Sequence, residues 1–206
     1  MISLKSGKGD TQHPRATFPA SRYAVFLLIA GIGFAVDLWT KDWIFSKLGD
    51  KLPGHVWWFW EGRFGLQLSL NRGALFGIGQ GLIPVFVVLS VSAAIGISFW
   101  LFRMREARSL WLTVTLAMVT GGIFGNLYDR LGLHGLVKDP ITKEPEYAVR
   151  DWILFQWDDM WRWPNFNIAD SLLVCGAIML VLHAFFVRPN EDDEHPKSVD
   201  QRKTVL

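Results

Sequence analysis

The chain has 206 residues, half of them hydrophobic, with 11 Trp, 15 Phe and a formal net charge of +2. A positive mean hydropathy and this many aromatic residues indicate a small integral membrane protein anchored at the membrane surface. The single cysteine, Cys175, excludes an intrachain disulfide, and so small a net charge gives no reason to expect a nucleic-acid partner.

Four stretches are long and apolar enough to cross a bilayer, for which a helix needs roughly 20 mostly apolar residues. The first is expected to stay as an anchor, because no small-residue cleavage site followed by a soluble domain is visible. Polar tails at 1–22 and 188–206, expected to be mobile, flank one membrane domain at 23–187. Within that domain the predicted spans are about 23–45, 82–102, 109–128 and 168–187.

The distribution of Lys and Arg predicts the orientation of these spans. Basic residues lie in both tails and in the short connection RMREAR at 103–108, which four spans place on one side of the membrane. Short cytoplasmic segments carry the excess of Lys and Arg, so both termini are expected in the cytoplasm. The segments at about 46–81 and 129–167 then face outward.

The first outward segment predicts a β-hairpin. From Phe64 to Asn71 apolar and polar residues alternate, which is typical of a strand with one apolar face. The preceding run VWWFW can pair with this strand, and its Trp residues suit the headgroup level of a bilayer. In the second outward segment DPITKEPE predicts an exposed turn, and the aromatic run DWILFQWDDMWRW is expected to lie along the membrane interface.

Polar residues recur where each predicted span meets the outer face. Ionisable groups close to hydrocarbon are costly and are kept when they are paired or used. Because these residues come from all four spans and both outward segments, we expect them to form one polar site. They are Asp37, Lys41, Asn71, Asn126, Asp129, Arg130, Asp151, Asn167 and Asp170.

Several of these residues also have simpler explanations. Asp170 can be a helix cap, and Asp129 can form a structural ion pair. Asn71 can be a turn residue, and Lys41 can extend its amine to the interface. Asp42, beside Lys41, is expected to be merely solvated.

The residue types limit the chemistry that such a site can perform. The sequence offers no Ser-His or Cys-His pair and no His/Cys cluster with metal spacing, so no metal or cofactor is expected. Two neighbouring carboxyl groups do not both ionise easily, so one keeps a proton while the other is charged. Such a pair can activate water and protonate a carbonyl, as in aspartic proteases.

Five ordered motifs, DLWTK, NRGALF, GGIFGNLYDR, VRDW and FNIAD, resemble those of the lipoprotein signal peptidases (signal peptidase II) over about 23–187. The resemblance implies a mainly α membrane protein with four transmembrane helices, a small outward β-cradle and an interfacial helix. It implies an endopeptidase of the bacterial cytoplasmic (inner) membrane, acting near the periplasmic face. Its substrates would be prolipoproteins, cut just before a diacylglyceryl-modified cysteine. The family is also the target of the antibiotic globomycin.

Matching the motifs residue by residue makes Asp151 and Asp170 the catalytic pair, with the order of their proton roles left open. Asn71, Asn126, Arg130 and Asn167 match positions that line the site or contact substrate. Asp37, Lys41 and Asp129 match supporting positions. Gly121, Gly122 and Gly125 are expected to let the third span pack closely against a neighbour or to leave room for substrate.

The sequence departs from the family pattern in two places. Trp152 stands where Phe is usual, and the run from Leu131 to Ala148 is longer than usual. The rivals for the first catalytic aspartate are therefore Asp129, Asp139, Asp158 and Asp159, of which Asp129, at a helix end within the motif, is the strongest. The alternative function is a small transporter or channel subunit with intramembrane acidic residues. The expected partners are signal peptides of prolipoproteins and membrane lipid, and the expected oligomeric state is a monomer.

Overall fold

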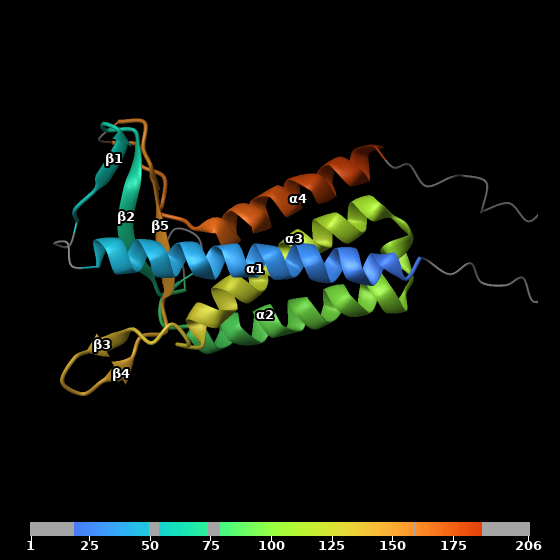
Figure 1. The fold of residues 1–206 in the computed structure, drawn as a ribbon, viewed down its shortest axis with the longest axis horizontal. Helices are drawn as coiled ribbons and strands as arrows, with labels where there is room; N and C mark the ends of the chain where they lie inside the picture. The colour runs from blue at the N-terminus through green and yellow to red at the C-terminus, as the bar shows by residue number, and fades with distance from the viewer. Residues whose placement is uncertain (1–18, 50–53, 74–78, 159, 187–206) are drawn as a thin grey trace, which may run out of the picture.

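The computed structural model describes residues 19–49, 54–73, 79–158 and 160–186. Four long helices run side by side, and a small sheet stands across one end of them (Figure 1). The helices are α1 (Ser21–Leu48), α2 (Ile83–Ser98), α3 (Leu110–Arg130) and α4 (Ile168–Phe186). A π-helical turn, η2 (Phe99–Arg103), extends α2, and a 3-10 turn, η3 (Glu106–Arg108), precedes α3.

All four helices are long and apolar enough to cross a membrane, which confirms the four predicted spans. Each described end lies within three residues of its predicted position. The predicted tails lie outside the described residues, apart from residues 19–22. The described ends of α1 and α4 at the tails lie at the end of the bundle opposite the sheet (Figure 1).

Helix α3 occupies the centre of the bundle, and small residues allow its neighbours to approach closely. A Cβ atom on Gly121 would lie 2.9 Å from the carbonyl oxygen of Ala30 on α1, and one on Gly122 would lie 2.5 Å from that of Ala169 on α4. The predicted role of these two glycines in close packing agrees with this geometry. The other three helices leave most of their apolar side chains exposed, as helices surrounded by lipid do.

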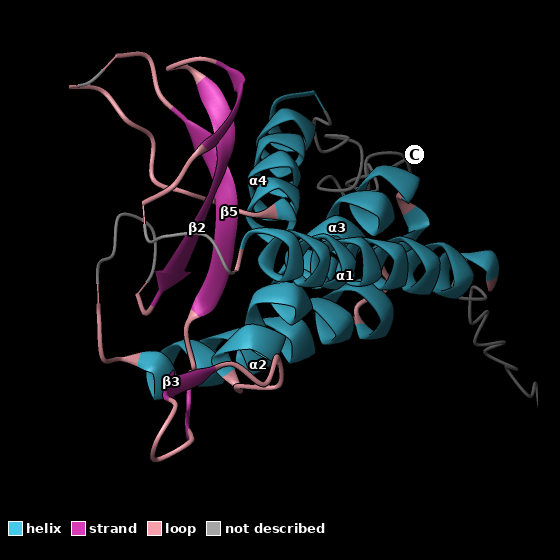
Figure 2. Cartoon of the chain, turned by 60° about the vertical axis from the view of Figure 1, so that its left-hand side comes forward, coloured by secondary structure: helices cyan, strands magenta, loops and turns pink. Residues whose placement is uncertain are grey.

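The sheet has three antiparallel strands in the order β1 (Trp57–Trp60), β2 (Phe64–Asn71) and β5 (Val149–Phe155). The predicted hairpin is confirmed, and β2 has the predicted bounds. Leu66 of β2 is buried against Ile44 and Leu48 of α1, so apolar packing fixes one part of the sheet to the bundle. The sheet passes the start of α4 (Figure 2).

The second outward segment differs from the expectation of an interfacial helix. Beyond the end of α3 at Arg130, its described residues contain no helix; they form β5 and a separate hairpin of β3 (Val137–Asp139) and β4 (Glu144–Pro145). The residues Asp151 to Phe155 pair with β2, a partner about 80 positions earlier that local sequence does not reveal. The predicted exposed turn is found at the tip of the β3–β4 hairpin, where Ile141 is almost fully exposed.

Candidate active site

All nine predicted site residues belong to elements that meet where the sheet covers the bundle. These elements are the second half of α1, the end of β2, the end of α3, strand β5 and the start of α4 (Figures 1 and 2). The structure therefore brings together residues that the sequence separates by as many as 132 positions.

Four amide groups hold the two predicted catalytic carboxylates. On Asp151, Oδ1 accepts a hydrogen bond from Asn167 Nδ2 (2.6 Å) and Oδ2 accepts one from Asn71 Nδ2 (3.2 Å). On Asp170, Oδ1 accepts from Asn126 Nδ2 (2.8 Å) and Oδ2 accepts from the backbone N–H of Asn167 (3.2 Å). Each carboxylate oxygen is thus held by a neutral donor, which orients both groups without an ion pair at either one.

Asn167 and Asp170 also begin α4 as a capping box. The Asp170 backbone N–H donates to Asn167 Oδ1 (2.9 Å), and the Asp170 carboxylate reaches back to the Asn167 N–H. The simpler explanation of Asp170 as a helix cap is therefore correct. Capping does not prevent Asp170 from belonging to the predicted catalytic pair, because its other carboxylate oxygen accepts from Asn126.

Burial controls the protonation of Asp151, whose side chain is almost inaccessible to solvent. Desolvation, followed by repulsion from the nearby Asp170 carboxylate, raises the pKa of Asp151 to about 7, although the bonds from Asn71 and Asn167 act against this rise. Asp151 can therefore keep a proton near neutral pH, as an acid–base catalyst requires.

A buried ion cluster lies beside the carboxylate pair and connects three helices. Lys41 Nζ lies 2.7 Å from Asp37 Oδ2 and 3.1 Å from Asp129 Oδ2, and it donates to Asn126 Oδ1 (3.2 Å). Asp37 Oδ1 accepts from the backbone N–H of Ala169 on α4 (2.9 Å). All three charged side chains are fully buried, so Lys41 does not extend to the interface.

Asp129, the rival for the first catalytic residue, has both oxygens occupied by cations. Oδ2 contacts Lys41, and Oδ1 accepts two hydrogen bonds from the Arg150 guanidinium, at 3.1 and 2.9 Å. This favours a supporting role for Asp129.

A cavity of about 310 Å³ opens beside Asp170 between α2, α3, α4 and the sheet. Its polar lining includes Asn71, Asn126 and Arg130, and its walls within the bundle are apolar. Arg130 stacks on Phe86 of α2, with 5.3 Å from its Cζ to the ring centre, and donates to the carbonyl oxygen of Gly73 (3.3 Å). The cavity therefore combines apolar walls with polar groups beside Asp170.

Sequence reasoning missed three residues around this site. Arg150 is buried beside Asp151 and also pairs with Asp42, which the sequence suggested to be only solvated. Glu146, in the longer run before β5, is buried and pairs with Arg72, the residue after Asn71. A charged residue inside an otherwise buried strand was the available signal for Arg150.

Among the residues that the structure describes, no group of three or more His, Cys, Asp and Glu side chains is arranged to hold a metal ion. The buried carboxylates have amide, ammonium or guanidinium partners instead.

Comparison with known proteins gives the same family as the motifs. The family model described as signal peptidase (SPase) II matches residues 29–186. The lipoprotein signal peptidase of Rhodopirellula baltica is 51% identical over 186 residues, covering 87% of this chain and 82% of the relative. That of Clostridium novyi is 31% identical over 156 residues, covering 76% and 94%.

A solved structure has the same fold. A bacterial membrane enzyme determined by the in meso method at 2.3 Å resolution superposes with a TM-score of 0.64 at 22% identity, covering 94% of this chain and all of that one. The family match and the four apolar helices make the protein a multi-pass bacterial membrane protease. The chain belongs to the signal peptidase II family.

Proposed function

We propose that the protein removes signal peptides from prolipoproteins by hydrolysing the peptide bond on the N-terminal side of a diacylglyceryl-modified cysteine. The catalytic residues in this proposal are Asp151 and Asp170. The observation that carries the proposal is that Asn167 donates a hydrogen bond to each carboxylate. Its side-chain amide donates to Asp151, and its backbone N–H donates to Asp170. A pair so held, with a raised pKa at Asp151, suits activation of water.

The surroundings of the two carboxylates differ, and this supports a division of proton roles. Asp170 lies in the first turn of α4, where the helix dipole stabilises a negative charge. We assign it as the base that removes a proton from the attacking water. Asp151 lies on a strand without such a dipole, and we assign it as the acid that donates its proton to the scissile carbonyl oxygen.

The tetrahedral intermediate then collapses with the protons in balance. Asp151 takes back a proton from a hydroxyl of the intermediate as the carbonyl re-forms. Asp170 gives the proton from water to the departing amide nitrogen, and the C–N bond breaks. Both groups return to their starting states.

The cavity beside Asp170 supports the substrate class. Its apolar walls, which include Ile123, Leu173 and Val174, suit a signal helix that crosses the membrane. Asn71 and Arg130 at the polar end suit the peptide backbone near the scissile bond. The acyl chains of the modified cysteine can remain in lipid, because α2 and α4 expose apolar side chains.

The orientation belongs to the same proposal. With Lys and Arg concentrated in both tails and the α2–α3 connection, both termini face the cytoplasm. The carboxylate pair then lies near the outer face of the bacterial cytoplasmic membrane. We propose that the protein acts as a monomer.

The alternative of a transporter or channel subunit fits the structure less well. A polar path through the bundle would need side chains that face one another across it. Thr113 and Thr120 of α3 instead donate to carbonyl groups of the preceding turn, Ser109 and Leu116, as packing residues do.

The test is cleavage of a synthetic diacylglyceryl-modified prolipoprotein by the purified protein in detergent, with the unlipidated peptide as control. Mass spectrometry is expected to show a product that begins with the modified cysteine, and globomycin is expected to inhibit its formation. Cleavage at another bond, or equal cleavage of the unlipidated peptide, would contradict the proposed specificity.

A further inference from the structure

Strand β5 presents Arg150 and Asp151 to opposite faces of the sheet. Asp151 lies opposite Ser69 of β2, and Arg150 lies opposite Leu70. The Asp151 face meets Asn71 and Asn167, whereas Arg150 lines a second cavity, of about 680 Å³, between the sheet and α1. Arg150 is therefore close to the catalytic pair in sequence but does not face it.

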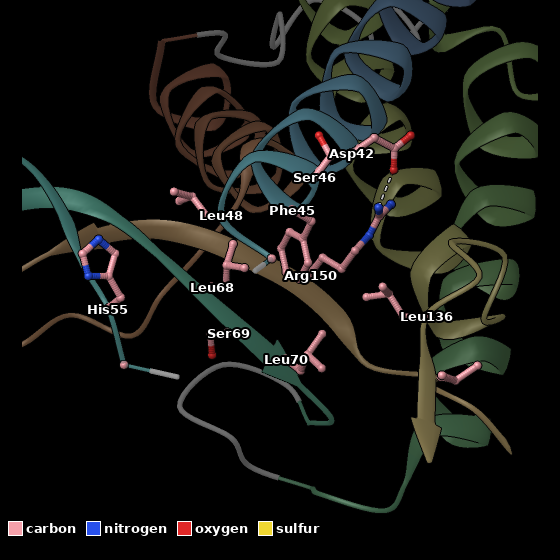
Figure 3. Close-up of a pocket in the computed structure, with 13 residues that line it drawn as sticks. Asp42, Phe45, Ser46, Leu48, His55, Leu68, Ser69, Leu70, Leu136 and Arg150 are labelled. Atoms are coloured by element: carbon pink, nitrogen blue, oxygen red, sulfur yellow. Dashed lines mark hydrogen bonds and ion pairs between the residues drawn. The ribbon is translucent and has the colours of Figure 1, made fainter. Parts of the chain in front are cut away.

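The Arg150 side chain binds two other elements. Its guanidinium donates from Nε (3.1 Å) and Nη2 (2.9 Å) to Asp129 Oδ1 at the end of α3, and from Nη1 to Asp42 of α1. It extends along the ring of Phe45 to reach Asp42, with 5.9 Å from its Cζ to the ring centre (Figure 3). Arg150 is only 2% exposed and Asp129 is fully buried, so their contact is shielded from solvent, whereas Asp42 is largely exposed.

The Arg150 backbone also contacts Asp129, and it contacts Asn167, which binds Asp151. Its N–H donates to Asp129 Oδ2 (2.9 Å), and its carbonyl oxygen accepts from Asn167 Nδ2 (3.5 Å). That amide nitrogen also donates to Asp151 Oδ1. The peptide units on both sides of Arg150 are thus fixed, and the next residue is Asp151.

The cavity makes these contacts important for the position of β5. Leu66 packs on Ile44 and Leu48, but farther along β2 Leu70 borders the open space of the cavity, as does Leu136 just before β3 (Figure 3). Trp152 of β5 also packs against Ile44 and Leu48, but at Arg150 itself a cavity rather than close-packed side chains separates the strand from α1. Arg150, with its partners on α1 and α3, bridges that space.

We propose that Arg150 is a positioning residue, which holds β5 against Asp129 and Asp42 so that the Asp151 carboxylate stays in reach of Asp170 and the scissile bond. The proposal rests on the proposed function, because it presumes that Asp151 is catalytic. A displacement of a reacting group by about 1 Å can slow a reaction by roughly a hundredfold. Loss of the Arg150 contacts with Asp129 and Asp42 therefore lowers kcat more than it weakens substrate binding.

The test compares Arg150→Met, Arg150→Lys and the control Lys138→Met in the cleavage assay. Arg150→Met keeps an unbranched apolar stem but loses the charge and the hydrogen bonds, and Arg150→Lys keeps the charge but not the planar fork. Lys138 is a half-exposed residue of the peripheral β3 strand, paired with Glu144. Melting temperature and gel filtration establish folding for each variant.

Arg150→Met is expected to lower kcat by roughly 10- to 100-fold with KM within about threefold, and Arg150→Lys is expected to fall between it and the wild type. Lys138→Met is expected to match the wild type. A folded Arg150→Met with unchanged kcat would overturn the proposal. So would loss of folded protein in both Arg150 variants, which would show a role in folding alone. If Asp151→Asn cleaves like the wild type, the proposed function fails instead.

Discussion

Asn167 donates its side-chain amide to Asp151 over 2.6 Å, from 16 positions further along the chain. The same residue caps α4 through its side-chain oxygen, which accepts from the Asp170 N–H. The start of a membrane helix and the orientation of a strand carboxylate therefore depend on one amide. This relationship explains how a helix-end residue and a strand residue can act as a pair.

The two roles of Asn167 can be separated by substitution. Asn167→Ser keeps a capping hydroxyl but cannot reach Asp151 with an amide, and Asn167→Ala loses both contacts. Both variants are expected to lose kcat by roughly tenfold or more, because an unoriented carboxylate leaves its productive geometry. Only Asn167→Ala is expected to lose stability, by about 1 kcal/mol for the missing cap. Wild-type kcat in Asn167→Ser would show that the bond to Asp151 is dispensable.

Helix packing gives a prediction independent of catalysis. A Cβ on Gly122 would lie 2.5 Å from the backbone oxygen of Ala169 and 2.9 Å from a Leu173 side-chain atom, so Gly122→Ala forces α3 and α4 apart. Overpacking of this kind costs about 1–3 kcal/mol. Gly31→Ala is the matched control, because nothing lies within 4 Å of its Cβ position on α1. Thermal melting in detergent should show a lower Tm for Gly122→Ala alone, and equal Tm values would refute the close packing.

Lys41 should be required for folding more than its neighbours on α1 are. Its removal leaves Asp37 and Asp129 without their shared ammonium group in a fully buried site. Breaking a buried pair in this way costs about 3–5 kcal/mol. Lys41→Met is therefore expected to reduce the folded fraction strongly, whereas Lys47→Met, at an exposed position of the same helix, is not. A normal melting curve for Lys41→Met would show that the cluster is not structurally important.

The raised pKa of Asp151 predicts how stability depends on pH. The pKa of Asp151 is about 7 in the folded protein, against about 3.9 for an unfolded aspartate. The folded state therefore holds this proton more tightly. The resulting stability is complete below about pH 4 and is lost as the pH rises through about 7.

Asp151→Asn cannot ionise and should escape this loss. Its Tm relative to the wild type is expected to be higher at about pH 8 than at about pH 5, by roughly 5 °C. Both proteins share every other titrating group, so the difference reports the titration of Asp151 together with its coupling to Asp170. A difference in Tm that does not change with pH would contradict a raised pKa.

The four spans could be predicted because a run of apolar residues long enough to cross a bilayer is a local property of the sequence. The strand Phe64–Asn71 was equally local, since its alternation is visible in eight residues. The pairing of β2 with β5 was not, because it joins residues about 80 positions apart, and the run DWILF reads equally well as an interfacial segment.

In the candidate site, too, local motifs could be recognised from the sequence, whereas long-range contacts could not. Motifs identified the aspartates and asparagines, whereas the partners of Asp129 depend on how β5 crosses the end of α1. The contacts of Arg150 with Asp129 and Asp42 could therefore be identified only from the structure. The same holds for Glu146, whose partner Arg72 is 74 positions away.

The most direct test of the central claim is the cleavage rate of Asp151→Asn, Asp170→Asn and Asp129→Asn on a lipidated prolipoprotein, with folding verified for each. The first two variants are expected to lose at least roughly a hundredfold in kcat, because each removes a proton-transfer group, while Asp129→Asn retains more activity than either. Cleavage by folded Asp151→Asn together with loss of cleavage in folded Asp129→Asn would contradict the assignment of Asp151 to the catalytic pair.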